Sequence, residues 1–380
     1  MSKFQAPGVY ANIKSSGNKP LEAVGSSTAA FIGQCATGPE NEAVMVTSWA
    51  QYEKTFGAFK ESPFLAHAVY GFFANGGGKC YVTNVGAPQE NQTLGDLTAA
   101  IMGEDKGPAK RTGINTFNHL EEVSLVSAPG LVNKEIQNII IDHCENMGDR
   151  FAILDCEEEL TTGIDQMARP KASANAGYYF PWLQVYDPVK KENVYQPPSG
   201  FVAGLYSRVD FDRGIHKAPA NEPLRGVSGL KYSLTRQEQT LLNPRGINLI
   251  RDFGDAGIKV YGARTLTDDP EWKYINVRRL FLNVKQTIEK GTEWAVFEPN
   301  NESLWGSIRR NIASFLKTLW KDEALVGSTP EEAFYVICDK SNNTQETIDQ
   351  GLLNIDIGIA PVKPAEFVNI NIQQKLEMEQ

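Results

Sequence analysis

The chain has 380 residues, of which 41% are hydrophobic, 10% aromatic and 22% charged. This is the composition of a globular protein with two to three domains, and it excludes disordered, collagen-like and coiled-coil chains. The formal net charge is -9 at pH 7, whereas a nucleic-acid-binding protein is normally basic overall, so we expect no nucleic-acid partner.

The first segment, residues 1–20, is predicted to be an extended arm. Val9, Ala11 and Ile13 alternate with more polar residues, among them Tyr10, and a period of two is that of a β-strand. Glycine and proline residues on both sides of this stretch limit its length, because both interrupt regular structure.

Residues 21–250 predict an α/β domain with short apolar strands and amphipathic helices. Expected strands lie at residues 28–33, 44–47, 80–85, 123–126 and 151–155, and expected helices at 48–56, 62–74 and 136–144. The succession of strand, helix and strand over residues 123–155 predicts a parallel pair with a right-handed crossover. We expect a loop with one short helix over residues 86–120, and an irregular course over the proline- and glycine-rich residues 187–250.

Residues 251–360 predict a second unit of strands and helices. Asn276 is the expected cap of a helix that ends at Gly291, and another helix is expected over residues 301–321. Expected strands lie at residues 258–262, 294–297, 334–338 and 353–359.

The last segment, residues 361–380, repeats the pattern of the first. Val368, Ile370 and Ile372 alternate with polar residues and are preceded by two prolines. Terminal strands with one apolar face promote aggregation unless they are paired. They can be ordinary edge strands of their own subunit or strands lent to neighbouring copies, and the pattern alone leaves both readings open.

Five cysteines are present, an odd number, and none forms a C-x-x-C pair. We therefore expect reduced, mostly buried thiols in a protein made in the cytosol. The first fourteen residues show no apolar signal-peptide region, and the apolar runs are far shorter than a membrane span, so we expect no direct membrane insertion.

The search for catalytic motifs is mostly negative. The glycines before Lys79 lack the spacing of a phosphate-binding loop and stand between a predicted helix and a strand, so a structural turn is favoured. No G-x-S-x-G or H-E-x-x-H motif occurs, and the four histidines are scattered. Asp155 ends a predicted parallel strand, where α/β folds place ligand sites, and a solvated strand end is the competing interpretation.

The predicted helix 301–321 carries a basic stripe. Arg310, Lys317 and Lys321 lie opposite its apolar face at 100° per residue. Residues 277–321 have a net charge of +4, whereas residues 322–380 have a net charge of -8. The stripe indicates either an acidic partner surface or a solvated helix face.

An ordered set of motifs resembles the contractile tail sheath family. No single motif is diagnostic, but together they cover nearly the whole chain in the expected order. They are residues 6–10 (APGVY), 24–33 (VGSSTAAFIG), 46–49 (VTSW), 72–82 (FFANGGGKCYV), 197–200 (PPSG), 214–221 (GIHKAPAN), 274–279 (YINVRR) and 297–300 (FEPN).

The resemblance implies an α/β fold (α+β mixed) with an N-terminal arm 1–20, an outer domain 21–250, an inner, tube-facing domain 251–360 and a C-terminal arm 361–380. Hinges are expected near residues 15–20 and 361–365. The expected inter-subunit arm residues are Val9, Tyr10, Ala11, Ile13, Val368, Ile370 and Ile372, and the expected tube contacts are Arg310, Lys317 and Lys321.

The function that the resemblance implies is mechanical, with no enzyme activity, cofactor or metal. Copies are expected to form a helical sleeve around an inner tube protein and to contract, with baseplate and terminator or cap proteins as further partners. Assembly is expected in the bacterial cytoplasm, within a phage tail or a phage-tail-like particle that can be released. The alternative is a cytosolic α/β enzyme with a site near Asp155.

Overall fold

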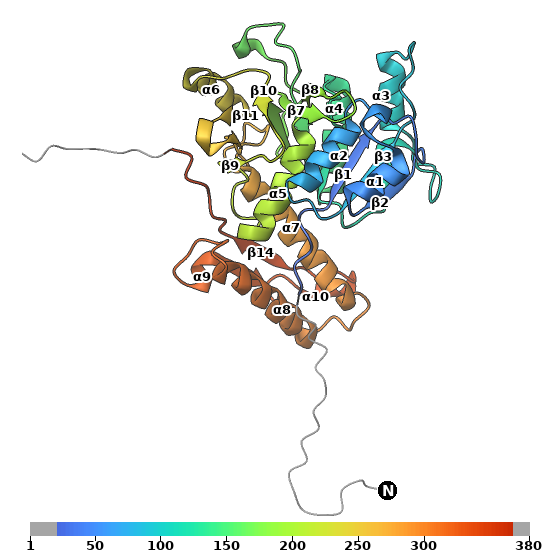
Figure 1. Cartoon of the computed structure of the whole chain (residues 1–380). Helices are drawn as coiled ribbons and strands as arrows, with labels where there is room; N and C mark the ends of the chain where they lie inside the picture. The colour runs from blue at the N-terminus through green and yellow to red at the C-terminus, as the bar shows by residue number, and fades with distance from the viewer. Residues whose placement is uncertain (1–20, 368–380) are drawn as a thin grey trace, which may run out of the picture.

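The computed structural model describes residues 21–367, which form a larger and a smaller domain (Figure 1). Within these residues, the larger domain is built on a nine-stranded sheet, and the smaller one packs two long helices against a two-stranded sheet. The predicted mixed α/β architecture is thus confirmed. The predicted arm residues Val9, Tyr10, Ala11, Ile13, Val368, Ile370 and Ile372 lie outside the described residues.

The large sheet has a parallel centre and antiparallel edges. Its order is β2 (Ala43–Val46), β3 (Cys80–Asn84), β1 (Ala29–Gly33), β4 (Leu125–Ser127), β5 (Phe151–Asp155), β6 (Ala176–Phe180), β11 (Ile247–Asp252), β12 (Ile258–Val260) and β9 (Glu222–Pro223). All neighbours from β3 to β11 pair in parallel, which confirms the parallel pair predicted over residues 123–155.

Helices cover both faces of the sheet, as Figure 1 shows. Because side chains alternate along a strand, Ala29 and Phe31 of β1 face one core and Ala30 and Ile32 face the other. The first core takes its helical residues from α1 (Trp49–Phe56), α2 (Leu65–Ala74), α5 (Ser199–Arg213) and part of α7 (Ile275–Thr292). The second takes them from α3 (Leu94–Met102), α4 (Lys134–Met147) and α6 (Arg236–Leu242).

Helix α5 occupies a region that was predicted to be irregular. Its glycines let α5 pack closely against α2, because a Cβ at Gly200 would lie 2.3 Å from the Ala68 carbonyl oxygen of α2. A Cβ at Gly204 would lie 2.3 Å from the Phe72 carbonyl oxygen of the same helix. The prediction was wrong because residues that usually mark a loop here let two helix backbones touch. Nearby, a small sheet joins β7 (Leu183–Asp187), β8 (Glu192–Gln196) and β10 (Gly229–Leu230).

The smaller domain has one apolar core of its own. That core lies between the long helices α7 (Ile275–Thr292) and α8 (Glu302–Lys321) and the antiparallel pair β13 (Phe334–Ile337) and β14 (Asp356–Ile359). Two short helices, α9 (Pro330–Ala333) and α10 (Gln345–Asp349), flank the strands. The basic-stripe helix predicted over residues 301–321 therefore corresponds to α8.

Two local predictions in this part were wrong. Residues 294–297 do not form a buried strand, because they join α7 to α8 in a tight connection where Val296 is 64% and Phe297 101% exposed. Asn276 does not cap α7, whose N-cap position is Tyr274; the Asn276 amide instead donates to the carbonyl oxygens of His216 at 2.7 Å and Val362 at 3.2 Å.

The expected domain boundary at residue 250 falls inside β11. Strand β12 follows that boundary and pairs with β11, so the large sheet continues at least to Val260. Helix α7 then spans both domains, since Ile275 and Leu282 pack in the larger core while Leu280 and Val284 pack in the smaller one.

Candidate functional site: arm anchors and the basic helix

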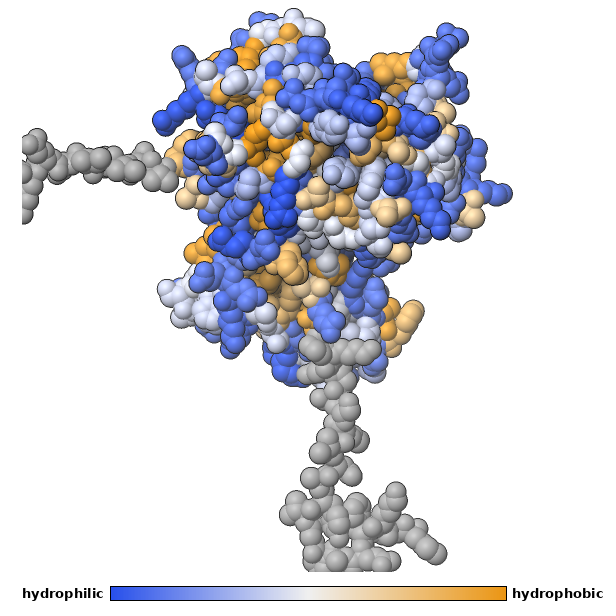
Figure 2. Space-filling view, viewed as in Figure 1, coloured by the Kyte–Doolittle hydropathy of each residue, from blue (hydrophilic) through white to orange (hydrophobic). Residues whose placement is uncertain are grey.

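Helix α8 presents the predicted stripe to the surface. Its apolar side, which includes Ile308 and Ile312, is buried, whereas Arg310, Lys317 and Lys321 are exposed. Within residues 21–367, none of the three cations has a carboxylate within 4.0 Å, and Arg310 donates only to the Ser307 hydroxyl at 3.1 Å. The stripe is therefore available to a partner. Figure 2 shows mostly hydrophilic residues on one face of both domains, interrupted by apolar patches.

A buried ion pair joins α7 to the larger domain. The Arg279 guanidinium donates to both oxygens of Asp210 in α5, at 3.0 and 2.6 Å, and the two side chains are 2% and 5% exposed. Ser26 donates to Asp210 at 2.6 Å, and Arg279 also donates to the Ser26 carbonyl oxygen at 2.9 Å. The guanidinium lies 4.6 Å from the centre of the Tyr206 ring. Both carboxylate oxygens of Asp210 and both terminal nitrogens of Arg279 thus have partners, which favours a fixed joint between the domains.

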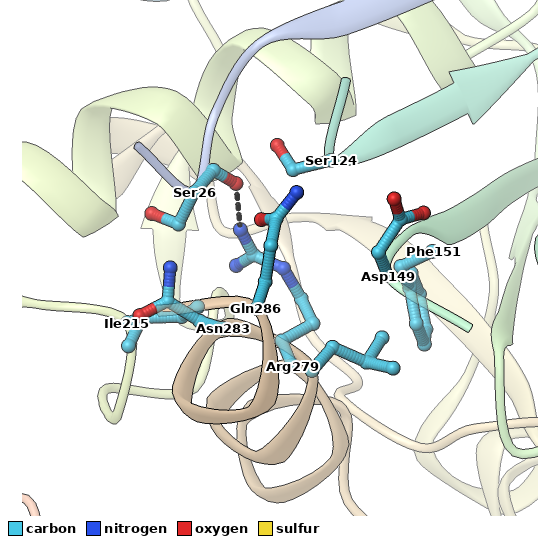
Figure 3. Close-up of a pocket in the computed structure, with 9 residues that line it drawn as sticks. Ser26, Ser124, Asp149, Phe151, Ile215, Arg279, Asn283 and Gln286 are labelled. Carbon is cyan, nitrogen blue, oxygen red and sulfur yellow. Dashed lines mark hydrogen bonds between the residues drawn. The ribbon is translucent and has the colours of Figure 1, made fainter. Parts of the chain in front are cut away.

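Figure 3 shows the space beside this joint, with Arg279, Asn283 and Gln286 of α7 pointing toward the larger domain. Its volume is about 10 Å³, which is barely enough to admit one water molecule. The space is thus too small for a substrate, and the joint is a packed contact.

The first described residues are fixed along α7. The Val24 amide donates to the Thr287 hydroxyl at 3.1 Å, and Asn283 donates to the Val24 carbonyl oxygen at 2.7 Å. Leu21 packs so closely on Gly291 that a Cβ there would lie 1.5 Å from a Leu21 methyl carbon. The base of the predicted N-terminal arm is therefore held near the C-terminal end of α7.

The chain after β14 is fastened to both domains. Pro361 forms a bridge with Leu325, and the Val362 amide donates to the Ala324 carbonyl oxygen at 3.2 Å, both within the smaller domain. Asn276 at the start of α7 then holds the Val362 carbonyl oxygen. These contacts lie inside the stretch where a hinge was expected.

Glu366 completes this fastening on the larger domain. Its carboxylate accepts two hydrogen bonds from Arg264, at 2.7 and 2.8 Å, one from Asn243 at 2.7 Å and one from the Tyr274 hydroxyl at 3.1 Å, with Lys273 at 3.5 Å. Burial alone would raise the pKa of Glu366, but these hydrogen bonds and the charges of Arg264 and Lys273 lower it to about 2. We call this arrangement the Glu366 clasp.

The β13–β14 sheet has two strands within the described residues, so each strand has one unpaired edge there. Tyr335 and Ile337 of β13 are exposed. Two-stranded sheets are marginal alone, and unpaired edges accept further strands.

Asp155 is a structural residue in this fold, and the interpretation as a solvated strand end was wrong. It is buried and accepts hydrogen bonds from the Ser199 amide and hydroxyl, both at 2.7 Å, and from the Gly130 amide at 3.0 Å. Burial raises the pKa of Asp155 to about 6, although these donors partly offset the effect. The carboxylate therefore connects the start of α5 to the end of β5.

A cavity of about 360 Å³ lies near the start of α4. Asp155 is not among its lining residues, which are Val132, Asn133, Lys134, Gln137, Glu157, Ala168, Arg169, Pro170 and Tyr178.

Within residues 21–367, no group of three or more His, Cys, Asp or Glu side chains is placed to hold a metal ion. In the same part of the chain, no helix combines the length and apolar character of a membrane span. The five cysteines are buried and form no disulfide bonds, as expected.

The sequence interpretation missed the joint and the clasp. Arg279 gave a usable signal, because it stands four residues after Ile275 and three before Leu282 on the buried face of α7, where a charge requires a partner. Glu366 gave none, since its partners lie about a hundred residues earlier in the chain.

Two family models match consecutive parts of the chain. The phage tail sheath protein central domain matches residues 114–266, and the phage tail sheath C-terminal domain matches residues 267–375. The tail sheath protein of Escherichia phage P2 is 23% identical over 302 residues, covering 76% of this chain and 73% of that protein.

Two solved sheath structures match almost end to end. The PVC sheath of an extracellular contractile injection system, in its contracted state, has a TM-score of 0.77 and 32% identity, and the match covers 99% of each chain. The contracted helical sheath of the anti-feeding prophage has a TM-score of 0.78 and 30% identity over 98% of this chain and 100% of that one. The chain belongs to the phage tail sheath family and is a subunit of a contractile sheath.

Proposed function

We propose that copies of this chain polymerise helically around an inner tube and contract to drive that tube through a target envelope. The carrying observation is the end-to-end similarity to sheath chains solved in the contracted state, because both domains have counterparts there. A contact that joins copies head to tail without closing builds such a helical filament.

The terminal arms connect neighbouring copies in this proposal. Val9, Tyr10, Ala11 and Ile13 from one end, and Val368, Ile370 and Ile372 from the other, pair with neighbours by strand addition. The unpaired edges of the β13–β14 sheet, within the described residues, support this because they are available acceptors. The anchors at Gly291 and Glu366 support it as well, since an arm that carries load needs a fixed base.

The basic stripe of α8 contacts the inner tube. Arg310, Lys317 and Lys321 are exposed and have no carboxylate within 4.0 Å in residues 21–367, which suits an acidic partner. Exposed ion pairs stabilise by only about 0.2–1 kcal/mol each, but a sleeve repeats the contact many times. A weak single contact also permits release of the tube during contraction.

The subunit catalyses no reaction in this proposal, because an extended sheath held by a kinetic barrier needs no fuel. Its further partners are baseplate proteins, which the match to a chain of the anti-feeding prophage baseplate supports, and terminator or cap proteins. Assembly takes place in the bacterial cytoplasm, within a phage tail or a phage-tail-like particle.

Electron microscopy of the chain co-produced with its inner tube tests the proposal. We expect extended, tube-filled sleeves that become shorter and wider on triggering, whereas uniform small particles would contradict sheath assembly. The variant Arg310→Glu/Lys317→Glu tests the tube contact and should give only empty or contracted sleeves. Lys340→Glu, an exposed control outside the stripe, should assemble normally. Normal filled sleeves from the double variant would refute the tube contact alone.

A further inference from the structure

The β11–β12 hairpin carries a basic and aromatic surface. Arg251 and Lys259 are direct cross-strand partners, so their side chains share one face, and Phe253 and Tyr261 follow each of them by two residues. The two rings lie 4.9 Å apart, and the Arg251 guanidinium lies 5.5 Å from Phe253 and 6.0 Å from Tyr261. We call these four residues the hairpin patch.

The charges of the hairpin patch are not compensated. Two cations directly opposite each other destabilise a sheet. Within residues 21–367, neither Arg251 nor Lys259 has a carboxylate within 4.0 Å. Arg251 donates to the Gln239 side chain at 3.0 Å, but its Nε is buried and has no hydrogen-bond partner there. The surface is therefore suited to carboxylates from elsewhere.

The aromatic residues of the hairpin patch add a requirement for apolar contact. Phe253 and Tyr261 are 36% and 40% exposed, and Lys259 lies 5.9 Å from the Phe253 ring. A fitting occupant thus combines acidic and apolar side chains in one short segment. Residues 376–380 (LEMEQ) have this composition, with Glu377 and Glu379 beside Leu376 and Met378.

The position of the Glu366 clasp brings that segment within reach. Asn243, which binds Glu366, is the C-cap of α6 and follows Gln239 by four residues, about 6 Å along the helix axis. Gln239 binds Arg251 and donates to the Tyr261 carbonyl oxygen at 3.0 Å. The last described residues accordingly run beside the larger domain on the side of α6 (Figure 1). Ten residues span about 33–36 Å when extended, enough to reach the hairpin patch from Phe367.

We propose that the hairpin patch is the docking site of the acidic C-terminal residues 376–380 of this chain. Glu377 and Glu379 pair with Arg251 and Lys259, while Leu376 and Met378 cover part of the ring surface. This contact goes beyond the proposed function, because it requires neither the inner tube nor strand addition. In the unassembled subunit it holds the C-terminal arm on its own copy until residues 368–372 pair with a neighbour, and tethering compensates for the weakness of each ion pair.

Zero-length carbodiimide cross-linking of the full chain tests the docking. We expect a bond between Lys259 and Glu377 or Glu379, identified by mass spectrometry. The Lys340–Glu302 pair, 2.8 Å apart, is the internal positive control. Mixing isotope-labelled and unlabelled copies shows whether the segment comes from the same copy or a neighbour. Formation of the control bond without a Lys259–tail bond, or capture by Lys259 of another acidic surface, would overturn the proposal.

A charge-swapped variant provides a second arm in which Lys259 is not the reacting amine. Glu377→Lys/Glu379→Lys alone removes the reacting tail carboxylates, so its loss of the Lys259–tail bond only identifies the bonded residues. Combining these changes with Arg251→Glu/Lys259→Glu should restore a cross-link, now between the introduced glutamate at position 259 and the introduced lysine at position 377 or 379. The matched control Lys106→Glu, made in the wild-type background, should leave the Lys259–tail bond unchanged. Absence of restoration in a folded, combined variant would count against the docking. Sleeve formation is scored separately by microscopy, so failure of sheath assembly is distinguishable from failure of docking.

Discussion

Arg279 of α7 and Asp210 of α5 form a two-pronged ion pair, buried where the two domains meet, although 69 residues separate them in the chain. Removing either partner leaves an uncompensated buried charge, which typically costs about 3–5 kcal/mol. We therefore expect Arg279→Ala and Asp210→Ala each to lower the free energy of unfolding by several kcal/mol. Urea unfolding of the unassembled subunit measures this, with the exposed Arg310→Ala as the control. A loss below about 1 kcal/mol, equal to that of an ordinary surface change, would contradict the structural role.

The elements that the sequence predicted well are those whose burial produces a simple pattern. Strands β1 and β5 are buried on both faces, so each is a short apolar run, and the crossover between β4 and β5 follows from the helix α4 between them. The exposed and buried sides of α8 differ clearly, which explains why its basic stripe could be located.

Helix α5 shows why other elements could not be predicted. Nearly all residues from Ser199 to Val209 are buried, so the helix has no polar face and no helical period. Gly200, Gly204 and the two prolines just before the helix normally mark a loop, and only the contact with α2 reveals the role of the glycines. The Glu366 clasp was likewise beyond the sequence, because local patterns do not encode partners as distant as Arg264.

The Glu366 clasp predicts a loss of stability in acid. The folded-state pKa of about 2 lies below the ordinary value of 4.5, so the contribution is complete above pH 4.5 and is lost as the pH falls toward 2. Glu366→Gln should be less stable than wild type at pH 7, and the difference should shrink between pH 4.5 and pH 2. Thermal melting across this range tests the prediction, with Glu346→Gln, an exposed carboxyl outside the clasp, as control. A constant difference between Glu366→Gln and wild type would refute the assignment.

The glycines of α5 make a prediction about packing. Gly200→Ala or Gly204→Ala puts a Cβ within 2.3 Å of a backbone oxygen of α2, so the helices must separate. Overpacking of this kind costs about 1–3 kcal/mol. Gly95→Ala in α3 is the matched control, because its nearest atom is 3.6 Å away and alanine favours helix by up to about 1 kcal/mol. Equal stability of all three variants in urea would show that α2 and α5 do not pack this tightly.

The anchoring of residues 21–28 makes a prediction about truncation. Deleting residues 1–14 removes none of the contacts of Leu21, Val24 or Ser26 with α7. We expect a monomer with an unchanged melting transition that no longer forms sleeves. Circular dichroism and size-exclusion chromatography test the two parts. Loss of cooperative melting would show that the first fourteen residues belong to the folding unit, and normal sleeves would remove them from the inter-subunit contacts.

Asp155 predicts a second pH dependence, of opposite sign. Its folded-state pKa of about 6 exceeds the ordinary value of 3.8, so the folded state binds the proton more tightly, and stability falls as the pH rises from about 4 to 6. The difference of about two pKa units corresponds to roughly 3 kcal/mol.

Asp155→Asn removes this titration, so its unfolding free energy should change less between pH 4 and pH 6 than that of wild type. The variant should also be less stable at pH 7 by about 1–3 kcal/mol, because the amide NH₂ group cannot accept from Ser199 or Gly130. Urea titrations at pH 4, 5, 6 and 7 measure both effects. Asp142→Asn on the surface of α4 should follow the wild-type profile. If Asp155→Asn keeps the wild-type slope, the carboxyl is not the group that titrates in this interval. Equal stability of Asp155→Asn and wild type at pH 7 would contradict its role as a buried connection between β5 and α5.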